Sequence, residues 1–429
     1  MGPQRKQARE KRERTKMAET NSNQTTSSEK DTLVEEPRPR SFFLTALPFY
    51  IMAHCAHHLL TALPMPMLPF IRKEFGLGYR QASYVTSSFA LANGAGQLPA
   101  GWLADRFGPT KLIMVGILGV ALAGILVGSS QTYVMLLISL VVMGLLAGGY
   151  HPAATPLISE SVEPNQQGRA LGFHLIGGNT AFFLGPIVAG TIAGVWGWRA
   201  SFIGLAVPTA IFGLIFYIYL RRRFSKTQAQ RTGRGNSEDK PPPPGNIRRM
   251  VAFLTMSVLG GGAGMSTTAF IPLYAVDRLG TPEATAASLL SIVFFSGLWI
   301  APVGGYISDR IGRVPIIIFG GIVSGTLIYL IPFANWGLSF FTILFFIGFA
   351  NAIRMPVSEA FIMGQVSSGH RSTIFGVYYF TMQYTGAVFA PILGELIDRW
   401  GFDICFSLAG STVVLVTIIC SFFLRGSRA

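Results

Sequence analysis

Charged residues are scarce in this chain, since only 13% of its 429 residues are Asp, Glu, Lys or Arg. That is about half the share found in soluble domains. Hydrophobic residues make up 50% of the sequence, and the mean hydropathy is +0.46. This composition excludes disorder, a coiled coil and collagen for the bulk of the chain, and it argues against a water-soluble globular enzyme.

The sequence also lacks the signatures of ATP-driven pumps and zinc enzymes. It contains no Gly-Lys dipeptide, so it has no phosphate-binding P-loop, and it contains no His-Glu-x-x-His motif. Its three cysteines, Cys55, Cys405 and Cys420, lie in apolar stretches and are too few for a disulfide framework. We therefore expect a protein that is not an enzyme, with no cofactor and no bound metal.

Long apolar stretches dominate what the chain does have. A helix needs about 20 apolar residues to cross a bilayer, and the 49 glycines suit helices that pack closely through small residues. The sequence predicts twelve spans, at about 42–69, 80–103, 111–130, 133–157, 170–194, 200–220, 249–274, 284–306, 314–333, 338–362, 372–395 and 403–424.

The spans predict an all-α membrane protein built from two six-helix halves. The expected organisation is a solvated basic tail over 1–41, an N-terminal half over 42–220, a linker over 221–248, a C-terminal half over 249–424 and a short tail over 425–429. The first 40 residues are polar, so they do not resemble a secretory signal. The linker contains the run Pro241–Pro244, which is typical of a flexible connection.

The net charge of +14 is explained by topology. If both termini face the cytoplasm, the tails, the linker and the loops on that side hold the large majority of the 34 Lys and Arg residues. The pattern predicts a multi-pass protein of the cell (inner) membrane with cytoplasmic termini. Its basic segments would contact the lipid bilayer, and we expect no nucleic-acid partner.

The two halves of the sequence repeat at a fixed offset of 204 residues. The segment Asp105-Arg106-Phe107-Gly108 returns as Asp309-Arg310-Ile311-Gly312. Other pairs at this offset are Pro152 and Pro356, Gly172 and Gly376, Gly190 and Gly394, Trp196-Gly197 and Trp400-Gly401, and Phe202 and Phe406. These matches indicate two copies of one unit in the same orientation. Secondary transporters built this way hold their site near the midplane, between the halves.

The repeated segment resembles the loop motif of the major facilitator superfamily of secondary transporters. The two copies are Gly101-Trp102-Leu103-Ala104-Asp105-Arg106-Phe107-Gly108 and Gly305-Tyr306-Ile307-Ser308-Asp309-Arg310-Ile311-Gly312-Arg313, and they fall after spans 2 and 8. The resemblance covers about residues 42–424. The first copy departs from the family pattern, because Pro109 and Thr110 stand where basic residues are usual.

The resemblance implies that this loop works as a gating latch, with a static turn cap as the alternative. Gly101 and Gly305 would let neighbouring helices approach, while Asp105 and Asp309 would accept hydrogen bonds from helix N-termini and pair with arginines. The residues expected to take part in gating are Gly101, Asp105, Arg106, Gly108, Glu160, Arg169, Gly305, Asp309, Arg310, Gly312, Glu359 and Arg371. Glu160 would pair with Arg106 or Arg169, and Glu359 with Arg310 or Arg371.

Two further patterns carry narrower resemblances. Gly185-Pro186 in span 5 and Pro391 in span 11 resemble a proline-kink motif of exchangers in the superfamily. His58-Leu59-Leu60, Gly149-Tyr150-His151-Pro152 and Gly177-Gly178-Asn179 resemble the fosmidomycin-resistance branch of drug exporters. Acidic residues of that branch are replaced here by Thr61-Ala62 and by Ala153, which argues against proton coupling through acids.

Span 1 carries a polar stripe on one helix face, formed by Tyr50, His54, His57, His58 and Thr61. Ionisable groups inside a membrane are costly and are functional candidates, so we expect the stripe to face the central pathway. Because histidine titrates near neutral pH, coupling to protons is one hypothesis and a packing role is the other. Metal ligation is the weakest alternative, since neither an acidic nor a thiolate cluster accompanies the histidines.

Span 10 carries Asn351, Arg354 and Ser358 on one face, and Arg354 is the only Arg or Lys well inside a span. A guanidinium at this depth suits a carboxylate or phosphonate, with a structural ion pair or a gate element as alternatives. His151 in span 4 and Tyr379 and Gln383 in span 11 complete the residues expected to bind substrate or protons.

Together these features predict a monomeric secondary transporter of a small molecule, coupled to an ion gradient and working by alternating access. Protons are the expected coupling ion. Export of a drug-like or anionic metabolite is the leading hypothesis, and uptake of an organic anion with protons is the second. A ligand sensor that does not transport is the alternative of another class.

Overall fold

A computed structural model describes residues 39–163, 166–224, 246–365 and 371–424, and every regular element within these ranges is helical. Side chains of some residues inside the helices are not described, among them those of Asp105, Asp309, Arg371 and Tyr379. The N-terminal half comprises α2 (Pro39–Thr45), α3 (Leu47–Thr61), α4 (Leu68–Phe75), α5 (Tyr79–Phe107), α6 (Pro109–Met114), the π-helical turn η1 (Val115–Gly119), α7 (Val120–Gly128), α8 (Tyr133–Ala147), α9 (Tyr150–Ser159), α10 (Gln167–Trp196) and α11 (Trp198–Phe224).

The C-terminal half also holds six predicted spans, with helix interruptions at other places. It comprises α12 (Asn246–Thr255), the π-helical turn η3 (Met256–Gly260), α13 (Gly261–Leu279), α14 (Glu283–Phe295), the 3₁₀ turn η4 (Ser296–Leu298), α15 (Ile300–Ile311), α16 (Arg313–Leu330), the 3₁₀ turn η5 (Ile331–Phe333), α17 (Leu338–Gln365) and α18 (Arg371–Leu424). α18 holds two predicted spans, because a glycine with φ 76°, Gly401, turns the chain between them.

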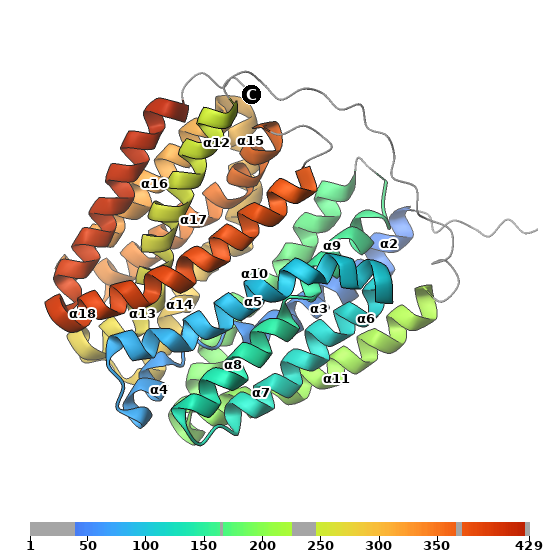
Figure 1. Ribbon diagram of the computed structural model, residues 1–429, viewed down its shortest axis with the longest axis horizontal. Helices are drawn as coiled ribbons and strands as arrows, with labels where there is room; N and C mark the ends of the chain where they lie inside the picture. The colour runs from blue at the N-terminus through green and yellow to red at the C-terminus, as the bar shows by residue number, and fades with distance from the viewer. Residues whose placement is uncertain (1–38, 164–165, 225–245, 366–370, 425–429) are drawn as a thin grey trace, which may run out of the picture.

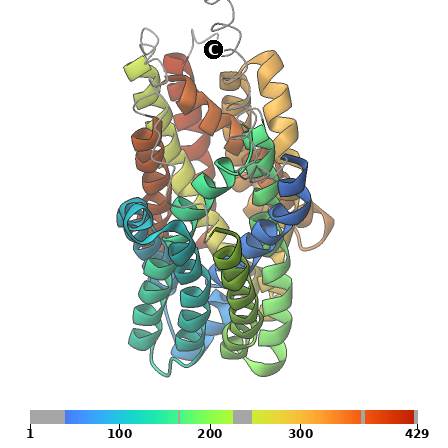
Figure 2. The same cartoon turned by 90° about the vertical axis from the view of Figure 1, so that its right-hand side faces the viewer.

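Eight helical stretches in the described ranges are long and apolar enough to cross a membrane. They include seven of the predicted spans and the joined pair in α18. The three remaining spans fall in α3, which has only 15 residues, in α5, and in the interrupted α14–η4–α15 stretch. The axes of the helices are broadly aligned, as a side view shows (Figure 2).

Glycines in the left-handed region mark the repeat in the backbone. Gly108 and Gly312 have φ of 90° and 92°, and Gly197 and Gly401 have φ of 83° and 76°. Both pairs keep the offset of 204 residues. A residue with a Cβ would be strained at these turns, so the same sharp reversals explain why glycine recurs at matching positions in the two copies.

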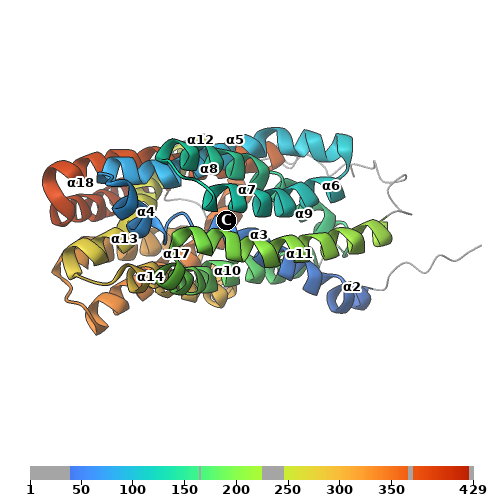
Figure 3. The ribbon, with the colours of Figure 1, turned by 90° about the horizontal axis from the view of Figure 1, so that it is seen from below.

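The two halves lie side by side (Figure 3) and meet most closely near α4 (Figure 1). At this end, which we call the α4 end, one apolar core joins residues of both halves, such as Leu63 and Met67 with Phe270 and Leu290. At the opposite end, where α11 ends and α12 begins, the core is divided. One cluster there belongs to the N-terminal half and a separate one to the C-terminal half. We call this second end the linker end.

Candidate functional site

Five histidines from three helices of the N-terminal half form one cluster. α3 supplies His54, His57 and His58, α9 supplies His151 and α10 supplies His174. The rings of His54 and His174 stack at 4.2 Å between centroids, and Nε2 of His58 lies 3.2 Å from Nε2 of His151. The sequence places three of these residues on one helix face, but it does not indicate that His151 and His174 complete the group.

Small residues let the helices come close enough to build this cluster. A Cβ on Gly177 would lie 2.0 Å from the carbonyl oxygen of Ile51, and one on Gly178 would lie 2.7 Å from the His54 ring. α10 therefore packs directly on α3 at this level. Gly177 and Gly178, which belong to the segment that resembles drug exporters, thus allow the imidazoles of α3 and α10 to come into contact.

Backbone carbonyls fix the orientation of the buried rings. Nδ1 of His54 lies 2.8 Å from the carbonyl oxygen of His174, Nδ1 of His57 lies 2.8 Å from that of Gly116, and Nδ1 of His174 lies 3.1 Å from that of Tyr50. Gly116 belongs to the π-helical turn η1, and such turns leave carbonyls free for other donors. A carbonyl accepts only, so each of these contacts places the proton on Nδ1 and leaves Nε2 with a lone pair. The N–H of Gly178 also points at Nδ1 of His54, at 3.2 Å, and we assign the tautomer of His54 from its shorter contact with the carbonyl.

The other residues of the span 1 stripe support the cluster. Thr61 donates a hydrogen bond to the carbonyl oxygen of His57 (3.4 Å) and lies 3.0 Å from Nδ1 of His58. The ring of Tyr50 is fully buried and packs edge-on against Phe216. Tyr50 therefore belongs to the core of the N-terminal half rather than to the face shared with His58.

The polar residues of α17 lie in the other half. Arg354 is half-buried, and its side chain lies over Gly320 of α16, where a Cβ would be 3.3 Å from that of Arg354. No carboxylate of the described residues forms an ion pair with Arg354. Ser358 is buried and Asn351 is half-buried on the same helix.

Two hydrogen bonds cross between the halves at mid-length. Gln383 of α18 donates to Oδ1 of Asn93 in α5 at 3.1 Å, and Asn179 of α10 donates to the carbonyl oxygen of Gly297 at 2.7 Å. The sequence predicts a polar role for Gln383, but the sequence analysis does not identify its partner Asn93. The position of Asn93, a polar residue in the middle of span 2, could have indicated this role.

Ion pairs across the halves close the α4 end. Arg72 lies 2.8 Å from Asp277, and Lys73 lies 2.5 Å from Glu283. Tyr79 donates to Asp277 at 2.7 Å. Burial and this hydrogen bond raise the pKa of Tyr79, so the phenol keeps its proton, while the hydrogen bond from Lys73 lowers the pKa of Glu283 and keeps it charged.

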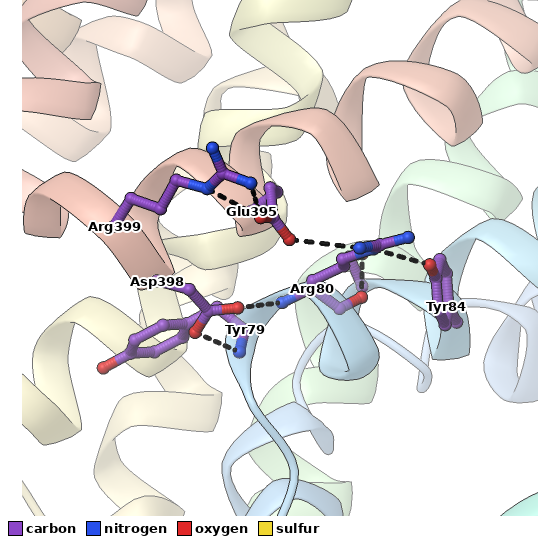
Figure 4. A network of polar contacts seen from close by, with 7 residues as sticks. Tyr79, Arg80, Tyr84, Glu395, Asp398 and Arg399 are labelled. Atoms are coloured by element: carbon purple, nitrogen blue, oxygen red, sulfur yellow. Dashed lines mark hydrogen bonds and ion pairs between the residues drawn. The ribbon is translucent and has the colours of Figure 1, made fainter.

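A carboxylate of one half caps a helix of the other half at the same end. The backbone N–H groups of Tyr79 and Arg80 donate to Asp398 at 2.9 and 3.0 Å (Figure 4). The N-cap residue of α5 is Gly78, which has no side chain to serve this purpose. Arg80 also lies 3.3 Å from Glu395. Asp398 therefore satisfies amide groups that α5 itself leaves open.

The repeated loop motif lies at the linker end, where the described arginines pack against aromatic rings. Arg106 lies over the rings of Trp102 and Phe107, Arg169 over those of Phe43 and Phe173, and Arg310 over that of Tyr306. Glu160 forms no ion pair with a described arginine. The proposed pairs of Asp105, Asp309 and Arg371 fall on side chains outside those described, and the same holds for Tyr379.

The glycines of the motif divide into two kinds. Gly108 and Gly312 have positive φ and end α5 and α15. No described atom lies within 4 Å of where a Cβ on Gly101 would stand. Its counterpart Gly305 lies outside the residues whose surroundings are described. Glu359 follows on α17, where it is half-buried.

The predicted kink prolines lie inside long helices, Pro186 in α10 and Pro391 in α18. The glycines that follow them make the contacts between halves. A Cβ on Gly190 would lie 2.9 Å from the carbonyl oxygen of Ala284, and one on Gly394 would lie 2.8 Å from that of Tyr79. Gly185 instead faces α3 within its own half, where a Cβ would lie 3.8 Å from the carbonyl oxygen of Leu59.

Comparison with known proteins decides the family. The family model described as Major Facilitator Superfamily matches residues 50–301 and 277–429. The chain belongs to the major facilitator superfamily. This confirms the resemblance found in the loop motif, the fold class of two six-helix halves, and the expectation of a membrane transporter rather than an enzyme.

Curated members of the superfamily are similar over most of their length. A probable sulfoacetate transporter, SauU, of Cupriavidus necator is 27% identical over 80% of this chain and 85% of its own. The multidrug resistance protein MdtG of Proteus mirabilis is 27% identical over 82% and 89%. A probable nitrate/nitrite antiporter, NarK1, of Thermus thermophilus is 30% identical over 70% and 69%.

Solved structures agree with the fold. A peptide transporter POT in complex with sulfate has a TM-score of 0.71 at 14% identity, and the match covers 87% of this chain and 93% of that one. A POT family transporter in complex with 5-aminolevulinic acid has a TM-score of 0.71 at 15% identity, covering 89% and 95%. At this identity the likeness concerns the fold alone.

Proposed function

We propose that this superfamily member is a proton-coupled secondary transporter that exports a small organic anion by alternating access. The proposal depends on one observation above all, the packing of five imidazoles inside the spanning helices of one half. The rings of His54, His57 and His58 lie 5.0, 5.7 and 5.3 Å from that of His151, between ring centroids. Histidine is the side chain that exchanges protons near neutral pH.

The His58–His151 pair provides a mechanism for coupling. Thr61 donates its hydroxyl proton to the His57 carbonyl and accepts from Nδ1 of His58. Nε2 of His58 is then an acceptor, and His151 donates across 3.2 Å. A second proton would set two N–H donors face to face and drive the rings apart. Protonation thereby changes the contact between α3 and α9, and it favours a different state of the half.

Two observations support an anion as solute. Arg354 is a half-buried guanidinium with no carboxylate partner among the described residues, and a charged side chain within a spanning helix is a functional candidate because its burial is costly. The names of SauU and NarK1 give sulfoacetate and nitrate or nitrite, which are small anions. The drug-like solute of the first hypothesis is supported by the name of MdtG, and uptake is the second direction to test.

The geometry also supports an assignment of conformational state. The halves share one core and several ion pairs at the α4 end, and they have separate cores at the linker end. With the termini in the cytoplasm, as the charge distribution predicts, the closed α4 end faces outward. The structure would then represent an inward-facing state of the transport cycle.

Flux into proteoliposomes tests the proposal. Inverted vesicles with an imposed pH gradient should accumulate a labelled sulfonate or carboxylate, and a protonophore should abolish the accumulation. Binding without accumulation would instead identify a ligand sensor. Accumulation only in right-side-out vesicles would identify uptake.

Variants of the histidine pair test the coupling. His58→Asn and His151→Asn should each flatten the dependence of flux on pH between roughly pH 5 and 8, because the shared proton is lost. His370→Asn removes a histidine far from the pair in the sequence and should leave the profile unchanged. A pH profile that survives both cluster variants would place the coupling elsewhere.

A further inference from the structure

The histidine cluster has the geometry of a transition-metal site. Ligand atoms of His54, His58 and His151 all lie within 4.8 Å of one another. The Nε2 atoms of His58 and His151 are 3.2 Å apart. Two nitrogens bonded to one tetrahedral zinc at 2.0–2.1 Å stand roughly 3.3 Å from each other, so this pair already has the required separation.

The third nitrogen is available for a ligand. The His54 side chain is 2% exposed, and its Nε2 has no hydrogen-bond partner in the described part of the chain. Leaving a buried polar atom unpaired is costly. A small rotation of the ring toward His58, whose centroid is 4.8 Å away, would bring this lone pair to a shared ion.

The supporting hydrogen bonds are those that metal ligands require. A ligating histidine donates its other ring N–H to a carbonyl or hydroxyl, which fixes the tautomer. His54 donates to the carbonyl oxygen of His174. Nδ1 of His58 donates to the hydroxyl of Thr61, which itself donates to the backbone carbonyl oxygen of His57. The Nε2 atoms of His54 and His58 are therefore lone-pair donors before any ion arrives. His151, whose Nε2 faces that of His58, would bind the ion in the tautomer that carries its proton on Nδ1.

The ligand set indicates which ions would bind. Neutral imidazoles suit Zn²⁺ and similar transition metals, whereas Mg²⁺ and Ca²⁺ prefer oxygen ligands. Three protein ligands leave one tetrahedral position open. His58 and His151 are only partly buried, so a water or an anion could occupy this position.

We propose that His54, His58 and His151 form a binding site for one borderline divalent transition-metal ion, with Zn²⁺ as the representative probe. The site joins α3 to α9. It does not depend on the proposed proton coupling, because it concerns binding to the resting protein and not the driving force of transport.

Calorimetric titration of the untagged, detergent-solubilised full chain with Zn²⁺ tests the site. We expect one ion per chain and no binding of Mg²⁺ or Ca²⁺. His58→Asn and His151→Asn should each weaken Zn²⁺ binding at least tenfold, while His370→Asn and Cys55→Ser should not. Absence of binding to the unmodified chain, or equal affinity in both cluster variants, would overturn the proposal.

Two further measurements cover the case in which a cluster variant fails to fold. X-ray absorption of the Zn²⁺-loaded unmodified chain should show imidazole nitrogens at about 2.0–2.1 Å, and a shell of oxygen or sulfur alone would contradict the site. Thr61→Val should weaken binding about tenfold by releasing His58, whereas Thr61→Ser, which keeps the hydroxyl, should restore it. Equal affinities in these two variants would remove Thr61 from its positioning role.

Discussion

At the scale of single residues, Gly190 and Gly394 are related by the offset of 204 residues and make equivalent contacts. Gly190 of α10 faces the backbone of α14, and Gly394 of α18 faces the backbone of α5. Each contact joins one half to the other. The sequence reveals the pair through its offset, but only the structure shows that both glycines lie where a helix of one half touches a helix of the other.

Replacing Gly394 by alanine should therefore weaken the closed α4 end. The new Cβ would lie 2.8 Å from the carbonyl oxygen of Tyr79, and backbone cannot yield as a side chain does. Overpacking of this kind costs about 1–3 kcal/mol. Maleimide labelling of a cysteine placed at the buried Ser83, in a background without native cysteines, should become faster. Gly204→Ala, where no described atom lies within 4 Å, is the control.

The guanidinium of Arg354 gives a second prediction at this scale. Arg354→Ala should reduce flux of an anionic solute at least tenfold, and Arg354→Lys should recover only part of it, because lysine lacks the planar bidentate fork. Arg222→Ala changes an exposed arginine of α11 and should have little effect. Unchanged anion flux in Arg354→Ala, measured at equal expression, would remove Arg354 from the substrate site.

α5 is an element whose start is completed by the other half. Its N-cap is a glycine, and Asp398 of α18 receives the N–H groups of Tyr79 and Arg80. These partners are 318 or more positions apart in the sequence, and no local pattern indicates such a contact. The sequence shows where α5 begins and that a glycine stands at its N-cap. It does not show that Asp398 takes the place of a capping side chain.

Asp398→Asn should open the α4 end without unfolding α5. The amide keeps one acceptor oxygen but loses the charge that favours a helix N-terminus, a contribution of about 0.3–1 kcal/mol. Distances between spin labels on α5 and α18 near this end should lengthen in a larger fraction of molecules. Asp403→Asn is the matched control, since Asp403 pairs with Arg278 inside the same half. An unchanged distance distribution for Asp398→Asn would contradict the capping role.

At the scale of the whole molecule, the ion pairs that join the two halves among the described residues lie at the α4 end and are partly exposed. Arg72 and Asp277 are about one quarter exposed, and pairs of this kind contribute roughly 0.2–1 kcal/mol each. The set is strong enough to favour one state and weak enough to break during a transport cycle. Composition and spacing predict two halves that move, but they do not indicate which end is closed.

Exchanging the charges of one such pair tests its role. Arg72→Asp alone should place two carboxylates together, favour opening of the α4 end and slow transport several-fold. Asp277→Arg in the same chain should restore much of the rate, because attraction returns with the signs reversed. The same exchange at Arg199 and Glu74, a pair inside the N-terminal half, separates folding effects from gating. Equal rates in the single and double variants would exclude the pair from gating.

The overall architecture was readable from the sequence, whereas contacts between distant helices were not. The offset of 204 residues, the loop motif and the hydropathy pattern predict the two halves and the family. Gly76 and Gly280 add an unnoticed pair at this offset, with φ of 61° and 66°. His174 joins His54 only because Gly177 and Gly178 bring α10 onto α3, a packing effect that spacing along one helix does not reveal.

The shared core at the α4 end has a consequence for how the molecule is assembled. Because apolar side chains of both halves pack together there, we expect the halves to associate without the covalent connection between α11 and α12. Two polypeptides, one ending after α11 and the other starting before α12, should find each other in the bilayer and copurify as a working pair. Each half would then behave as a separate folding unit within the single chain.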